Sequence, residues 1–176
     1  MRIVVLQENQ EDRQEVEEVV KKSFIGAEFS DNNEHILVKR LRETDEFIEE
    51  LSLIAKVKDK IVGYILYTTI KVCDDENEYE GIALAPLCVL PEYQNKGIGK
   101  ELIKKSLGRA YELGYDFAVV LGHEHYYSKF GFKPSWKYDI KAPFDVPEDS
   151  YMIIELQSGV LNDISGVVKY SDTFFE

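Results

Sequence analysis

The chain has 176 residues, of which 44% are hydrophobic and 12% aromatic, so it is long and apolar enough to form one compact domain with a buried core. It carries 21 lysine and arginine residues against 33 aspartate and glutamate residues, which gives a formal net charge of −12. Because a chain this acidic repels the phosphate backbone, the composition excludes nonspecific binding to nucleic acid.

The apolar runs and the cysteines indicate a cytoplasmic protein. The run at residues 3–6 is too short for the core of a secretory signal peptide, and nowhere do eighteen apolar residues follow one another, so no membrane partner is expected. Cys73 lies in an acidic segment and Cys88 in an apolar run, a distribution typical of reduced thiols. No zinc-ligand spacing is present, and the sequence therefore predicts no metal site.

The first third of the chain predicts a strand and two helices. Residues 2–7 are a short β-branched run, which indicates a strand. Asn9 is expected to cap the helix that follows, with acidic residues in its first turn and lysines in its last. A connection at residues 26–31 leads to a second helix within residues 32–47. The apolar faces of these helices consist of Val16, Val19, Val20 and Phe24 in the first, and Ile36, Leu37, Leu41 and Phe47 in the second.

The middle of the chain predicts an antiparallel hairpin at residues 51–70, which turns through residues 58–60. An acidic loop at residues 73–80 precedes an apolar strand at residues 82–90, and a helix at residues 98–113 leads to another buried strand at residues 115–121. This succession implies a right-handed crossover and parallel pairing. The remaining elements are expected to be a short helix at residues 123–130 and strands at residues 151–156 and 160–168. We expect a mixed α/β (α+β) fold in a single domain, residues 1–176.

The turn between the strand at residues 82–90 and the next helix is a candidate anion site. Gly97 and Gly99 lack a Cβ, so the free amides of the first helical turn can approach a ligand closely. Lys96, Lys100 and Lys104 recur every four residues along one helix face. Either feature alone also fits an ordinary helix start with a solvated lysine face. The turn contains neither GxxxxGK[ST] nor GxGxxG, which excludes the common nucleotide loops.

Two motifs together resemble the GNAT N-acetyltransferase superfamily. The stretch LCVLPEYQNKGIGKELI has the form Q/R-x-x-G-x-G/A of that family's acetyl-coenzyme A motif, between a strand and a helix. The second motif, a tyrosine four residues before a Gly-Phe pair, is present in YYSKFGF, residues 126–132. The resemblance covers residues 2–132, with the core motifs at residues 82–132. The chain further resembles a bacterial subgroup of acetyltransferases. It implies a central, mostly antiparallel sheet that is splayed at the acetyl-coenzyme A site and flanked by helices.

The resemblance also implies which residues act. Tyr127 matches the general acid that protonates the leaving thiolate, and a tyrosine hydroxyl stays protonated at neutral pH. Tyr126 is expected to be structural, and Cys88 to make main-chain contacts only, since a buried cysteine is usually inert. The main-chain N–H near Leu87 is expected to stabilise the thioester oxyanion. Acetyl-coenzyme A, the cosubstrate, is expected to contact Leu87, Cys88, Val89, Gln94, Asn95, Lys96, Gly97, Ile98, Gly99 and Lys100.

The base and the acceptor stay open at this stage. Histone-acetylating relatives have a glutamate eleven residues before the motif's glutamine, where this chain has Ala83. Glu80, Glu28 and His123 are alternatives, as is a water relay. The resemblance implies an acetyltransferase that acts on a small-molecule or peptide amine. A non-catalytic domain that binds or senses acyl-coenzyme A is the alternative, and another acyl group or an oxygen acceptor is a third. Whether the chain forms a homodimer stays open.

Overall fold

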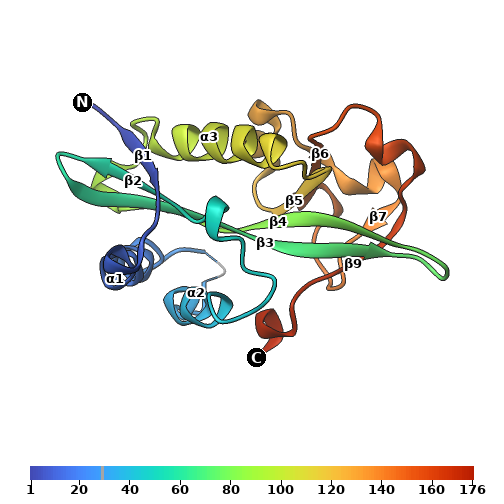
Figure 1. Cartoon of the computed structure of the whole chain (residues 1–176), viewed down its shortest axis with the longest axis horizontal. Coiled ribbons are helices and arrows are strands. Elements are labelled where there is room, and N and C mark those ends of the chain that lie inside the picture. The colour runs from blue at the N-terminus through green and yellow to red at the C-terminus, as the bar shows by residue number, and fades with distance from the viewer. Residues whose placement is uncertain (29) are drawn as a thin grey trace.

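The computed structural model describes residues 1–28 and 30–176, which form one open sheet with helices on both faces (Figure 1). In spatial order the strands are β1, β2, β3, β4, β5, β8 and β6, while β9 pairs with β3 and β7 pairs with β9. Their bounds are β1 Val4–Gln7, β2 Leu53–Val57, β3 Lys60–Cys73, β4 Glu78–Val89, β5 Phe117–Leu121, β6 Lys133–Pro134, β7 Ile140–Lys141, β8 Tyr151–Glu155 and β9 Gly166–Lys169.

The pairing of neighbouring strands confirms the predicted hairpin and crossover. Strands β1 to β4 pair antiparallel in chain order. Lys58 and Asp59 join β2 to β3 with φ angles of 50° and 64°, a left-handed conformation that suits the tight turn of a twisted hairpin. β4 and β5 pair in parallel, and the helix between them provides the crossover.

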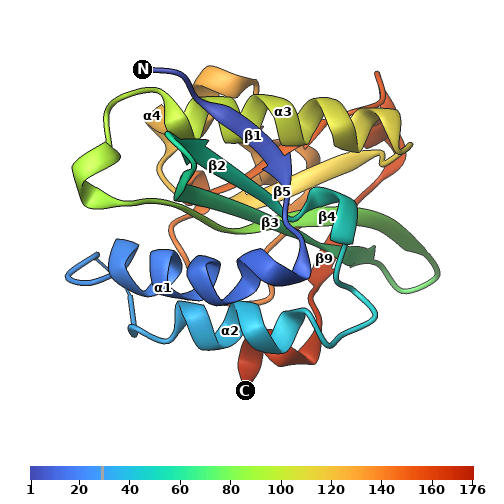
Figure 2. The same ribbon diagram turned by 60° about the vertical axis from the view of Figure 1, so that its left-hand side comes forward.

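The helices divide between the two faces of the sheet (Figures 1 and 2). α1 Arg13–Ser23 and α2 Glu34–Leu41 cover one face, and α3 Ile98–Glu112 covers the other. The short α4 Glu124–Tyr127 follows β5. The predicted cap is confirmed, because the Asn9 side chain accepts hydrogen bonds from Glu11 N (2.9 Å) and Asp12 N (3.2 Å) in the 3₁₀ turn that leads into α1.

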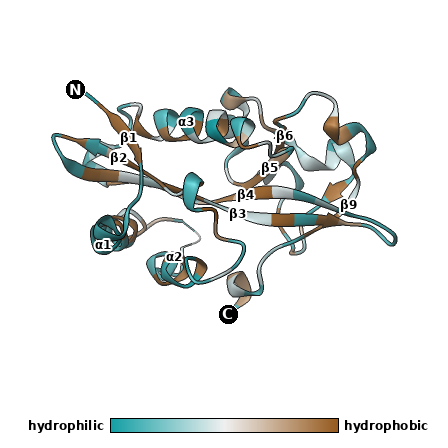
Figure 3. Ribbon diagram, viewed as in Figure 1, coloured by the Kyte–Doolittle hydropathy of each residue, from teal (hydrophilic) through white to brown (hydrophobic). Residues whose placement is uncertain are grey.

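Hydrophobic residues concentrate in the sheet, which explains why it forms the centre of the fold. Figure 3 shows the middle of β3 and β4 as hydrophobic and the loop that joins them as hydrophilic. Tyr64 and Tyr67 of β3 are fully buried, one on each face of the sheet. The Tyr67 hydroxyl lies 2.9 Å from Ser106 Oγ and so links β3 to α3.

Three expectations about local structure were wrong. The acidic loop is only residues 74–77, because the ladder between β3 and β4 continues to Cys73 opposite Glu78. Phe47 lies beyond α2 and forms a bridge with Thr68 of β3. Residues 160–168 are a 3₁₀ helix, Val160–Asp163, followed by β9. The expected connection at residues 26–31 contains Phe29, which lies outside the described residues.

A buried ion pair joins the N-terminal elements. The side chains of Glu8, after β1, and Arg42, after α2, form a salt bridge, and each is only 2% exposed. Ser52 donates to the second Glu8 oxygen (2.5 Å), and its hydroxyl lies 2.7 Å from that of Tyr64 in β3. The Glu8 carboxylate is therefore held by groups from α2, the start of β2 and β3.

Candidate active site

The sheet opens between β4 and β5. β4 pairs with β5 through three residues only, the last of them Leu84 opposite Val120. Beyond this point β4 continues to Val89, and its register with β3 shifts at residues 85–86, where Pro86 also lacks an N–H group. Within the described residues no strand pairs with this edge of β4 after Leu84. A ligand chain can therefore lie along it as an additional strand does.

The open edge presents the main chain of Leu87 and Val89. Leu90 N donates to Val62 O of β3 (2.8 Å). In an antiparallel pair, the main-chain N–H and C=O groups of successive residues point alternately toward the partner strand and away from it. The N–H and C=O groups of Leu87 and Val89 consequently face away from β3, whereas those of Cys88 face it. The Val89 carbonyl accepts a hydrogen bond from Gln94 Nε2 (3.1 Å), which ties the turn to the edge.

The glycine turn leads from this edge to the amino end of α3. Gly97 has a φ of 85°, and a Cβ added to it would meet no heavy atom within 4 Å. Ile98 is the first residue of α3 and is buried, while Gln94, Asn95, Lys96 and Lys100 are exposed around it. The first-turn amides have no acceptor within the helix, and so they face an open space suited to an anion.

The lysines differ in what they contact. Lys96 Nζ lies 5.5 Å from the centre of the Tyr93 ring, and Lys60 Nζ approaches the same ring to 5.5 Å. Lys100 is one turn of α3 further along and exposed. Lys60 Nζ also lies 3.9 Å from a carboxylate oxygen of Glu92, which offsets its charge, so Lys96 is the cation on this ring that adds positive charge beside the turn.

Tyr127 is held in one orientation at the other side of the opening. It is 8% exposed, and its ring packs edge-to-face against Tyr126 (5.1 Å between ring centres) and Phe132 (5.7 Å). The ring also fills the space beside Gly122, where a Cβ would come within 2.3 Å of it. Burial raises the pKa of Tyr127, so its hydroxyl keeps the proton that a general acid must donate.

The two motifs touch each other, which the sequence did not reveal. The Tyr126 hydroxyl oxygen lies 2.6 Å from the position that a Cβ of Gly99 would occupy. α4 therefore packs its first tyrosine against the start of α3 and its second beside Gly122. In the sequence the two tyrosines are adjacent, and nothing there indicates which of them reaches Gly99.

The candidate bases lie in different parts of the fold. Glu80 precedes Leu87 by seven residues of β4, about 23 Å at roughly 3.3 Å per residue, which is too far for direct proton transfer. His123 caps α4, and its carbonyl accepts the N–H groups of Tyr126 and Tyr127 (both 3.1 Å). Glu28 is exposed in the segment after α1. Of the three, His123 is on the same helical turn as Tyr127.

Two other buried groups bear on the chemistry. Burial raises the pKa of the Cys88 thiol to about 12, so at neutral pH it is not a thiolate and does not act as a nucleophile. The hydroxyl of Thr68 on β3 is fully buried and has no hydrogen-bond partner among the described residues. Thr68 pairs with Ala83 in the part of β4 that is still paired with β5, and no sequence motif marked it.

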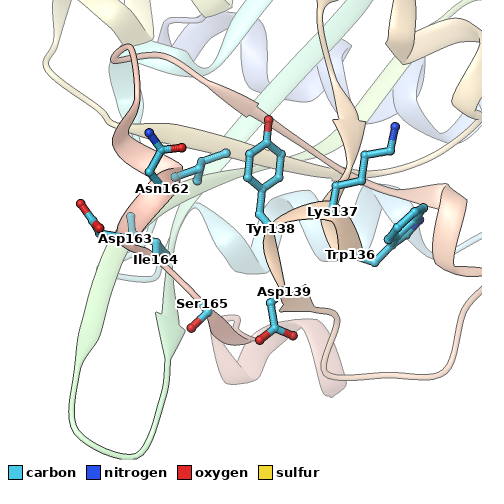
Figure 4. Close-up of a pocket in the computed structure, with 9 residues that line it drawn as sticks. Trp136, Lys137, Tyr138, Asp139, Asn162, Asp163, Ile164 and Ser165 are labelled. Atoms are coloured by element: carbon cyan, nitrogen blue, oxygen red, sulfur yellow. The ribbon is translucent and has the colours of Figure 1, made fainter.

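Two hollows of the surface lie outside this opening. One, of about 650 Å³, is lined by residues 136–139 and 161–165, and Figure 4 shows Trp136 and Lys137 extending away from Asp163 and Ser165. The other, of about 820 Å³, lies over β1 and β2 beside Tyr93. In residues 1–28 and 30–176 no cluster of three potential metal ligands occurs. No helix in the same ranges has the length and apolarity to cross a membrane.

Comparison with known proteins agrees with this arrangement. The family described as Acetyltransferase (GNAT) family matches residues 13–132. Among curated proteins, the uncharacterized N-acetyltransferase YhbS of Escherichia coli (strain K12) is 30% identical over 147 residues, which are 83% of this chain and 86% of that one. The uncharacterized N-acetyltransferase YjhQ of the same strain is 34% identical over 131 residues, which are 74% of this chain and 72% of that one.

Solved structures show the same fold. The crystal structure of YhbS from Escherichia coli in complex with coenzyme A matches with a TM-score of 0.89 and 26% identity, over 100% of this chain and 93% of that one. A GNAT family acetyltransferase from Brucella melitensis, in complex with acetyl-coenzyme A, has a TM-score of 0.80 and 24% identity, over 98% of both chains. The expected fold class is confirmed, and the chain belongs to the GNAT family of acetyltransferases.

Proposed function

We propose that the protein transfers an acetyl group from acetyl-coenzyme A to a primary amine of a small molecule or peptide. The observation that carries the proposal is the continuity of one surface: the unpaired edge of β4 ends at the open amino end of α3, and Tyr127 is anchored across the opening. Residues 1–176 would act as a single N-acetyltransferase domain. The acidic surface favours a cationic acceptor.

The residues present fit the coenzyme. The amides of residues 94–100 suit its diphosphate, because Gly97 leaves the space in front of them open and Lys96 and Lys100 reduce the charge. The main-chain groups of the edge residues Leu87 and Val89 suit hydrogen bonds with the amide groups of the pantetheine arm. The main chain of Cys88 faces β3, so Cys88 holds the edge strand in place and does not bond to the arm. The crystal structure of YhbS in complex with coenzyme A supports the binding of this coenzyme by the shared fold.

The chemistry follows from the position of the thioester at the opening. The acceptor nitrogen forms a bond to the acetyl carbon, and the carbon–sulfur bond breaks. The N–H of Leu87 stabilises the negative charge that develops on the carbonyl oxygen. Tyr127 donates its proton to the departing sulfur, and the amine loses its proton through water or His123. The pKa of Tyr127 lies above its usual value near 10, so the acid form persists across neutral and mildly alkaline pH.

A panel of amines tests the proposed function directly. The protein is mixed with acetyl-coenzyme A and, in turn, polyamines, amino acids, aminoglycosides and peptides with a free α-amine, and release of the free thiol is followed. We expect release above the rate without acceptor for at least one cationic amine. Binding of coenzyme A without amine-dependent release across the panel would favour the non-catalytic alternative, and release with alcohols alone would favour an oxygen acceptor.

Replacing Tyr127 by phenylalanine tests the proton donor. The change keeps the ring that packs beside Gly122 and removes only the hydroxyl, so we expect kcat to fall about 100-fold while the affinity for coenzyme A changes less than twofold. Thiol release gives the rate and calorimetric titration gives the affinity. An unchanged kcat, with an acceptor that works for the wild type, would contradict the role of Tyr127.

A further inference from the structure

We infer that the hydroxyl of Tyr126 is a ligand of the coenzyme A diphosphate, and that it requires glycine at position 99. The inference rests on the proposed coenzyme site and adds a side chain from outside the glycine turn. It starts from one contact: the Tyr126 hydroxyl oxygen lies 2.6 Å from the point that a Cβ of residue 99 would occupy.

This contact places the hydroxyl at the amino end of α3. Each Cα–Cβ bond of an α-helix tilts toward the helix N-terminus, and Gly99 is the second residue of α3. An atom in the place of its Cβ therefore lies beside the first-turn amides, which have no acceptor within the helix. An anion bound to those amides comes within reach of the hydroxyl as well.

The hydroxyl is positioned and able to donate. The Tyr126 ring packs edge-to-face on Tyr127 (5.1 Å between ring centres) and on Phe130 (5.4 Å), which fixes its direction. Burial raises the pKa of Tyr126, and no hydrogen bond from another described group contributes to that shift. The half-buried hydroxyl thus keeps its proton and has it available for a phosphate oxygen.

The same contact accounts for the glycine. Gly99 does not have a positive φ, so its backbone accommodates alanine, which is also the better helix former. An alanine methyl group would overlap the Tyr126 hydroxyl. Without that hydroxyl, the nearest atoms to the methyl group would be Tyr126 Cζ at 3.8 Å and Val89 Cγ2 at 3.9 Å, which are ordinary van der Waals contacts. The obstacle to alanine is therefore one oxygen atom.

A double-mutant cycle tests both parts of the inference. Tyr126→Phe, Gly99→Ala and the double variant are titrated calorimetrically with coenzyme A and, separately, with pantetheine, which lacks the diphosphate. Tyr111→Phe is the control, because Tyr111 is exposed on α3. Melting temperatures of the ligand-free proteins show whether each variant is folded.

We expect Tyr126→Phe to weaken coenzyme A binding about 10-fold, as for the loss of a hydrogen bond to a charged oxygen, and to leave pantetheine binding unchanged. Gly99→Ala should lower both the melting temperature and the affinity for coenzyme A. In the double variant the melting temperature should return to that of the wild type, while the affinity stays at the level of Tyr126→Phe. Tyr111→Phe should match the wild type.

The outcomes separate this inference from the proposed function. If Gly97→Glu abolishes coenzyme A binding while Tyr126→Phe binds like the wild type, the role of Tyr126 is wrong and the site stands. If Gly99→Ala is equally harmful with and without the Tyr126 hydroxyl, the steric part is wrong. If Gly97→Glu leaves binding intact, the coenzyme site itself is wrong.

Discussion

Replacing Gly97 by glutamate is expected to abolish detectable coenzyme A binding, with a loss of affinity on the order of 1,000-fold. The new carboxylate would extend into the open space in front of the first-turn amides of α3, where it would occupy the place of the diphosphate and repel it. In addition, a φ of 85° disfavours any residue with a Cβ. Calorimetric titration with coenzyme A measures the effect, and thiol release should be lost with it.

Two matched variants separate the causes of this loss. Gly97→Asn introduces a side chain that tolerates a left-handed backbone and carries no charge, and it should bind more tightly than Gly97→Glu. Gly108→Glu adds the same charge to the same helix, at a position where a Cβ also meets nothing within 4 Å, and it should bind like the wild type. Equal affinities of Gly97→Glu and the wild type would show that the diphosphate lies elsewhere.

Replacing Arg42 by methionine is expected to lower the free energy of unfolding by about 3–5 kcal/mol. The change leaves the Glu8 carboxylate, which is 2% exposed, without its cationic partner, although Ser52 still donates to it. Arg42 also binds Glu17 (2.8 Å), but that side chain is 29% exposed and can turn to water. Urea denaturation followed by circular dichroism gives the free energy of unfolding. If the slope of this free energy against urea concentration is unchanged, the folded and unfolded states have kept their compactness.

The partner variant tests the stated cause. Combining Arg42→Met with Glu8→Gln removes the buried charge and keeps an oxygen for Ser52, so the double variant should recover most of the lost stability. Lys71→Met, which breaks the exposed ion pair with Glu78, should leave the free energy of unfolding almost unchanged. If Arg42→Met were as mild as Lys71→Met, the buried pair would not be a main support of this part of the fold.

Elements with strong local patterns were predictable. The apolar spacing of residues 16–24 and the polar cap at Asn9 specify a helix through neighbouring residues alone, and the β2–β3 hairpin follows from two apolar runs around a polar turn. The prediction of one strand at residues 160–168 was wrong because its apolar residues belong to two different elements. Leu161 is buried from a 3₁₀ helix and Val168 from β9. Burial of that kind depends on the partner surface, which a one-dimensional pattern does not contain.

By itself the sequence determined the local pieces of the proposed site: the glycine turn, the helix that follows it and the tyrosine motif are each short segments whose backbone and side-chain chemistry is local. Only the tertiary structure decided how these pieces meet. It turned the main chain of Leu87 and Val89 away from β3, placed Glu80 far along β4 from Leu87, and set the Tyr126 hydroxyl against Gly99. Such relations join residues distant in the chain, and they arise from strand register and helix packing, which no single segment specifies.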